Sequence, residues 1–97
     1  MSADKTLASR TEKIREALRA ALNIKFVEVT DESHLHLGHE GARSGMGHFH
    51  VKVVAFEFTE LSLIKRHRLI YDAVGKLMKT DIHALSIDAI SPDEQID

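Results

Sequence analysis

Two short segments of alternating apolar and polar residues, separated by a polar stretch, most strongly limit what this chain can fold into. Residues 26–31 place Val27 and Val29 on one side of an extended chain, and residues 48–56 repeat the alternation. The apolar set of the second segment is Phe49, Val51, Val53 and Ala55. Because period-two alternation is typical of a strand with one buried face, we predict two strands. Residues 32–47 then form an unusually long connection, of the kind that is kept for function or left without order.

Two segments with helical periodicity surround these strands. Residues 10–22 carry one apolar stripe, made of Ile14, Leu18, Ala21 and Leu22. A longer helix is predicted from Ser62, its N-cap, to about Lys79. The predicted apolar row of this helix is Leu63, His67, Ile70, Val74 and Leu77. In this phase Arg66 and Arg68 lie on either side of the row.

The last strand is predicted at residues 82–90, where His83, Leu85, Ile87 and Ala89 share one face. Ser91 and Pro92 then open a short terminal helix. The order helix, strand, strand, helix, strand, helix predicts an α+β domain, in which helices cover a three-stranded mixed sheet. We assign residues 1–9 to a flexible tail and residues 10–97 to this single domain.

Composition excludes several classes of function. The 97 residues include no cysteine, which rules out disulfides, a thiol nucleophile and a thiolate metal site made by this chain alone. No apolar run approaches the roughly 20 residues that span a bilayer, so we expect a cytoplasmic protein without a membrane contact. Signatures of nucleophilic or nucleotide-dependent catalysis are missing, and we expect no enzyme. Alone, the chain is expected to be a monomer or a weak homodimer.

Histidine is concentrated in one stretch, since five of the seven histidines lie between Asp31 and His50. Imidazole is the commonest metal-ligating side chain. His34 and His36 are two residues apart and can converge on one ion, which His39 can join; the alternative is a solvated histidine-rich loop. For His83, a strand-edge side chain with one hydrogen bond and a metal ligand are both possible. A zinc site of the loop alone would use His34, His36 and His39 without His83.

Charge is unevenly distributed although the net charge is only −2. Residues 61–79 sum to +4, whereas residues 81–97 contain five acids and no base. The basic residues of the first segment are Lys65, Arg66, Arg68, Lys76 and Lys79. These five residues make DNA binding the alternative function, while a solvated basic rim is the structural alternative.

Four motifs, in this order and at these spacings, resemble the BolA family over about residues 10–95. They are Glu32-Ser33-x-x-His36, Gly47-His48-Phe49-x-Val51, Arg66-His67-Arg68-x-x-Tyr71 and Ile82-His83-Ala84-Leu85. The loop resembles that of bacterial members with a histidine in place of a cysteine. Two departures stand out: Gly47 precedes His48 where threonine is common, and Glu60 occupies a position that is often glycine.

The resemblance implies a fold similar to class II KH domains and a partner, a monothiol glutaredoxin. The pair would share a bridging [2Fe–2S] cluster used in iron–sulfur trafficking or iron-responsive regulation. Carried over to this chain, the ligands would be His83 and His36, with His34 and His39 as alternates to His36. The glutaredoxin cysteine and a glutathione thiol would hold the other iron, and the isolated chain is expected to bind no cofactor. Some members of the family are linked to transcription, which is the DNA-binding alternative.

Overall fold

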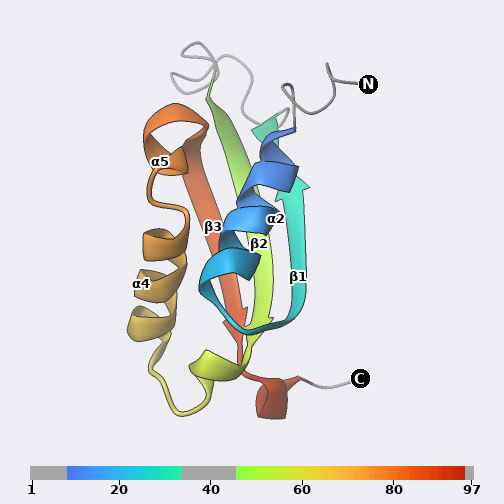
Figure 1. Cartoon of the computed structure of the whole chain (residues 1–97), viewed down its shortest axis with the longest axis vertical. Coiled ribbons are helices and arrows are strands. Elements are labelled where there is room, and N and C mark those ends of the chain that lie inside the picture. The colour runs from blue at the N-terminus through green and yellow to red at the C-terminus, as the bar shows by residue number, and fades with distance from the viewer. Residues whose placement is uncertain (1–8, 34–45, 96–97) are drawn as a thin grey trace.

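The structure is a computed structural model that describes residues 9–33 and 46–95, and its elements follow the predicted order (Figure 1). The elements are helix α2 (Arg10–Ala21), strands β1 (Ile24–Asp31) and β2 (Gly47–Ala55), the single-turn helix η2 (Phe56–Phe58), helices α4 (Leu63–Ala73) and α5 (Leu77–Thr80), strand β3 (Ile82–Ile90) and the single-turn helix η3 (Pro92–Glu94). The predicted α+β fold with a three-stranded mixed sheet is confirmed. None of the described helices is long and apolar enough to cross a bilayer.

The sheet has the order β1-β2-β3, with β2 in the centre. Strands β1 and β2 are antiparallel and pair Val27 with Val53, whereas β2 and β3 are parallel and pair Val51 with Ile87. A parallel pair needs a crossover connection, and the segment that contains α4 supplies it. Helices α2 and α4 therefore lie on the same face of the sheet, as Figure 1 shows.

The core fills the space between this face and the two helices. Helix α2 contributes Ile14 and Leu18, helix α4 contributes Ile70, and all three are fully buried. The inward row of β2 is buried as the alternation predicts; it consists of Phe49, Val51, Val53 and Ala55. Burial of each large side chain contributes roughly 1.5–3 kcal/mol relative to exposure, so this row holds the helices on the sheet.

Strand β1 begins at Ile24, two residues before the predicted start. Ile24 pairs with Ala55 and Phe26 with Val54, so Lys25 is an extra residue in the ladder. This irregularity interrupts the alternation on which the prediction depended. Phe26 remains 40% exposed on the face away from the helices, where the Lys52 ammonium lies 5.9 Å from its ring.

The predicted long helix is two helices. Helix α4 ends at Ala73, residues 74–76 form a turn, and α5 begins at Leu77. The Gly75 N–H bonds to the Asp72 carbonyl in place of the helical partner one residue earlier. Glycine is about 1 kcal/mol less favourable than alanine inside a helix, which is consistent with a break at this position.

The predicted apolar row of α4 is wrong by one position at its N-terminal end. Leu63 is 62% exposed and His67 only half-buried, whereas Arg66 is 5% exposed in line with Ile70 and Val74. Hydrophobic periodicity misplaced the row because a charged residue occupies a buried position. Ser62 does cap the helix, since its hydroxyl accepts a hydrogen bond from the Lys65 N–H.

Arg66 is buried because all of its polar contacts are made within the protein. Its guanidinium donates to the carbonyls of Leu61 and Ala89, and it holds the Glu94 carboxylate at 2.6 and 3.1 Å. The prediction that Arg66 is available to bind phosphate is therefore wrong. The bidentate contact with Arg66 lowers the pKa of Glu94 from 4.5 to about 2.

Glu60 departs from glycine in sequence but keeps a glycine-like backbone. Its φ angle is 67°, in the left-handed region that side chains with a Cβ disfavour. The turn before α4 therefore has the conformation expected for glycine, although glutamate occupies the position.

Replacement of Glu60 with glycine is expected to raise the free energy of unfolding by about 0.5–1 kcal/mol, because it relieves the left-handed strain. Urea denaturation measures the change. Glu60→Ala is the matched control: it removes the same side chain but keeps the Cβ, so its stability should stay near that of the wild type. An equal gain in stability from both variants would show that the Glu60 carboxylate, and not its backbone conformation, destabilises the wild-type protein.

Replacement of Glu94 with glutamine should lower the free energy of unfolding at neutral pH. It should also make this free energy depend less on pH in the acid range. Because the pKa of Glu94 is lower in the folded state, its ionised form stabilises the fold above about pH 4.5, and that contribution is lost as the pH falls toward about 2. Thermal unfolding between pH 2 and 7 measures both effects. Glu12→Gln is the control, since Glu12 pairs with the more exposed Arg15 on the helix surface. Parallel pH profiles of wild type and Glu94→Gln would contradict the assignment.

Candidate metal centre

His83 lies at an irregularity at the start of β3. The parallel ladder pairs Gly47 with Ile82 but His48 with Ala84, so β3 has one extra residue here. Such a bulge changes the direction of a side chain, and His83 is exposed. The prediction that His83 shares a face with Leu85, Ile87 and Ala89 is wrong, because the extra residue breaks the alternation.

The ring of His83 lies beside the ring of His48, near the start of β2. The two ring centres are 5.1 Å apart and the ring planes are inclined by 45°. His48 is half-buried and its Nε2 is shielded from solvent. Because His48 alternates with the buried Phe49, the imidazole pair lies on the sheet face away from the helices.

Backbone contacts fix His48 from the side of β1. Its N–H donates to the Ser33 hydroxyl at 3.1 Å, and its carbonyl accepts from the Glu32 N–H at 2.8 Å. Gly47 permits this close approach, since a Cβ there would lie 2.6 Å from the Ser33 hydroxyl and 2.7 Å from the Phe49 ring. The absence of a side chain at Gly47 thus brings the end of β1 close to the imidazole pair.

Asp81 fixes the start of β3 in a similar way. Its carbonyl accepts from the Gly47 N–H at 2.9 Å, and its carboxylate receives Arg10 and Lys13 of helix α2 at 3.3 and 3.4 Å. A hydrogen bond from the Thr80 hydroxyl and the charge of Lys13 keep the pKa of Asp81 below its ordinary value despite burial. The carboxylate therefore acts as a structural anion that ties α2 to the strand bearing His83.

The three loop histidines, His34, His36 and His39, lie outside the described residues, so their ligand roles stay predictions. The described neighbours of this stretch are informative, because Ser33 precedes it and contacts His48 directly. Within residues 9–33 and 46–95, no group of three or more histidine, aspartate or glutamate residues has the spacing of a metal site. Among the described residues, His48 and His83 are the histidines whose rings are in contact, and any further ligands of a metal held there would come from other groups.

Sequence reasoning identified His83 but missed its neighbour, because His48 had been assigned only to strand β2. The parallel pairing of the starts of β2 and β3 brings the two together, and no local pattern encodes that pairing. A neutral imidazole offers a lone pair to zinc, copper, nickel or iron. The pair can therefore ligate a metal, with His83 on the accessible side.

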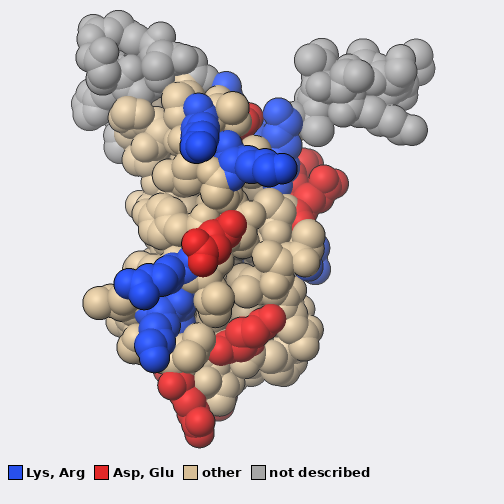
Figure 2. All heavy atoms as spheres, turned by 60° about the vertical axis from the view of Figure 1, so that its left-hand side comes forward, with Lys and Arg blue, Asp and Glu red and all other residues tan. Residues whose placement is uncertain are grey.

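The basic residues do not form one continuous strip. Lys65, Arg68, Lys76 and Lys79 are exposed, whereas Arg66 is buried. Figure 2 shows the basic side chains of this face in an upper and a lower group, with an acidic side chain between them. Four of the five predicted nucleic-acid contacts are thus accessible, in a divided arrangement.

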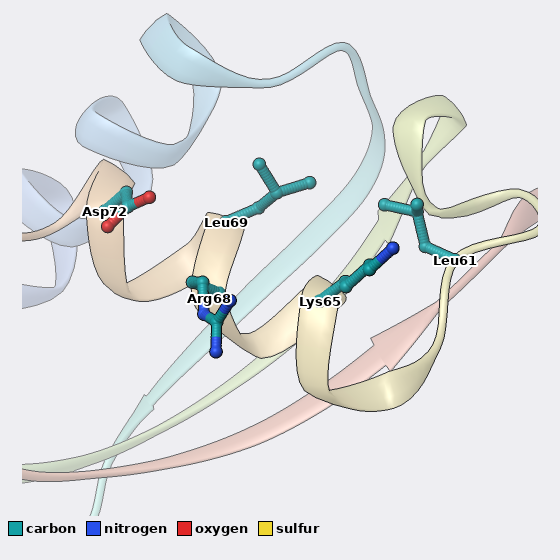
Figure 3. Close-up of a pocket in the computed structure, with 5 residues that line it drawn as sticks. All are labelled: Leu61, Lys65, Arg68, Leu69 and Asp72. Carbon is teal, nitrogen blue, oxygen red and sulfur yellow. The ribbon is translucent and has the colours of Figure 1, made fainter.

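A hollow of about 310 Å³ lies along α4. Its lining residues are Leu61, Lys65, Arg68, Leu69 and Asp72. Figure 3 shows Leu61 and Leu69 pointing toward each other across the hollow, with Lys65 reaching toward Leu61. The hollow therefore combines an apolar wall with two cations and one carboxylate.

Comparison with known proteins gives a consistent match. The family model described as BolA-like protein covers residues 18–94. The SufE-like protein 1, chloroplastic/mitochondrial, of Arabidopsis thaliana is 43% identical over 93 residues, which are 91% of this chain and 25% of that protein. The DNA-binding transcriptional regulator BolA of Escherichia coli is 41% identical over 76 residues, which are 78% of this chain and 70% of that one.

Solved structures agree with this match. The BolA domain of SufE1 from A. thaliana superposes with a TM-score of 0.78 at 43% identity, and the match covers 92% of this chain and 99% of that chain. BolA1 from A. thaliana gives 0.77 at 35% identity, covering 91% and 97%. The chain spans 25% of the SufE-like protein and 57% of the chloroplastic protein BOLA1, so it corresponds to one part of each. With a family model that matches most of its residues, this chain belongs to the BolA family.

Proposed function

We propose that the protein is a non-enzymatic partner of a monothiol glutaredoxin, with which it shares a bridging [2Fe–2S] cluster for iron–sulfur trafficking or iron-responsive regulation. The observation that carries the proposal is His83, which is exposed at a strand bulge that Asp81 and the paired strands hold in place. A fixed, accessible imidazole suits a ligand that must meet a cluster brought by another protein. The helices and the sheet, held together in part by the contact between Arg66 and Glu94, form the scaffold that positions His83.

The composition supports a shared site. With no cysteine, the chain has no thiolate to offer iron, and the Asp81 carboxylate is already held by two cations. Thiolates would come from the glutaredoxin and from glutathione. Two imidazoles on one iron and two thiolates on the other resemble the Rieske arrangement, which has a higher potential than four thiolates. Because imidazole must be neutral to ligate, protonation favours release of the cluster, which suits a carrier.

Within this proposal His83 is the fixed ligand and His36 the second ligand from the loop. His34 and His39 are alternates to His36. The contact between Ser33 and His48 supports a ligand from residues 34–45, because Ser33 directly precedes these residues in the chain and lies beside the imidazole pair.

Loss of the His83 imidazole should abolish the shared cluster. Anaerobic reconstitution with iron, sulfide, glutathione and a monothiol glutaredoxin is expected to give a visible circular dichroism spectrum unlike that of the glutaredoxin homodimer. The His83→Ala variant should return the homodimer spectrum. His50→Ala is the matched control, since His50 lies on the same strand and face as His48, and it should leave the spectrum unchanged. A wild-type spectrum from His83→Ala would remove His83 from the cluster.

DNA binding is the second candidate, and two observations favour it. The E. coli relative is named a DNA-binding transcriptional regulator. Lys65 and Arg68 are exposed on one side of α4 and line the hollow there. Cations at such positions can meet phosphates, with affinity that falls steeply as salt releases the counterions.

Replacement of Lys65 and Arg68 by glutamine distinguishes this candidate from the first. If the protein binds DNA here, the slope of log affinity against log salt should fall by about 1 for each phosphate contact removed. Fluorescence anisotropy with a labelled duplex measures the slope. The His83→Ala variant should bind DNA as the wild type does, so loss of DNA affinity in that variant would tie the two activities to one site.

A further inference from the structure

We propose that His48 and His83 form a binding site of their own for a single borderline divalent ion, of the class of Cu²⁺, Ni²⁺ and Zn²⁺. This site would operate in the isolated chain. It requires neither the loop histidines nor a glutaredoxin, so it does not rest on the function proposed above.

The spacing of the two rings fits one shared ion. A tetrahedral metal with nitrogen ligands at about 2.0–2.1 Å places the centres of two imidazoles roughly 5 Å apart. The observed separation is 5.1 Å. Rings in ordinary aromatic contact also have centres roughly 4.5–7 Å apart, so the spacing fits a ring contact as well as a shared ion, and the titration below separates the two.

The site is built on rigid elements and not on a loop. His48 lies in the central strand, where Ser33 and Glu32 hold its backbone N–H and carbonyl. His83 lies on the adjacent strand, where the extra residue of the bulge brings its ring next to His48. Two ligands held in this way lose little conformational freedom when they bind an ion, which favours binding.

Accessibility and ligand type decide what can bind. His83 is exposed whereas Nε2 of His48 is shielded, so the ion enters from the His83 side and keeps water in its remaining positions. Nitrogen ligands bind Cu²⁺ more tightly than Ni²⁺ or Zn²⁺, whereas the tetrahedral spacing is that of Zn²⁺, so the site suits either ion and Cu²⁺ serves as the spectroscopic probe. The Asp81 carboxylate, two residues before His83 in the chain, is committed to Arg10 and Lys13 of α2, and two imidazole nitrogens do not suit Mg²⁺ or Ca²⁺, which prefer oxygen ligands.

The experiment uses the full chain without glutaredoxin, sulfide or glutathione. A background variant with His34→Ala, His36→Ala and His39→Ala removes the competing loop ligands. Titration with Cu²⁺, followed by electron paramagnetic resonance, should show one ion with two nitrogen ligands in this background. His83→Ala in the same background should weaken the affinity by at least the roughly 10–100-fold that is lost when a partner of a metal ligand is removed, and it should remove the two-nitrogen signature.

Further variants separate the strand pair from other histidines. His48→Asn should reproduce the loss caused by His83→Ala, and circular dichroism checks that each variant is folded. His50→Ala in the background should bind like the background itself. The proposal is overturned if the loop variant alone abolishes binding, or if folded His48→Asn and His83→Ala variants keep the two-nitrogen signature. Either result leaves the shared cluster to its own test, because that assay contains the partner and this one does not.

Discussion

The parallel pairing of β2 with β3 is the contact on which the rest of the structure depends. It places the last strand beside the central one and requires a crossover through α4, which packs on the sheet face that α2 also covers. Its irregularity at Gly47 and His48 leaves His83 as the extra residue. The same pairing therefore builds the core on one face and brings two imidazoles together on the other.

The fold was largely predictable because its strands and helices carry their own patterns. The alternation in β2 correctly predicted the buried row of Phe49, Val51 and Val53, and Ser62 was correctly predicted as an N-cap. Local pattern failed where a long-range contact decided the outcome. Arg66 occupies a core position because Glu94 and the carbonyls of Leu61 and Ala89 satisfy it, and both Ala89 and Glu94 are far away in sequence.

The candidate site was half predictable for the same reason. His83 was identified from the histidine pattern and the family resemblance, but its orientation was not, because a bulge leaves no trace in a period-two alternation. The neighbour His48 was hidden, since its role follows from the register between two strands that are distant in the chain. The ligand roles of His34, His36 and His39 stay predictions, because these residues lie outside the described part of the chain.

The salt bridges of Asp81 have a consequence for how the protein opens. Arg10 and Lys13 belong to the first described helix, and Asp81 directly precedes the last strand, so these ion pairs join distant parts of the chain at one end of the sheet. A partial opening that released α2 would break both ion pairs, whereas the backbone pairing of β2 with β3 would still hold the start of β3. The end of the sheet that bears the imidazoles is thus also the place where the N-terminal helix is fastened to the last strand by charge.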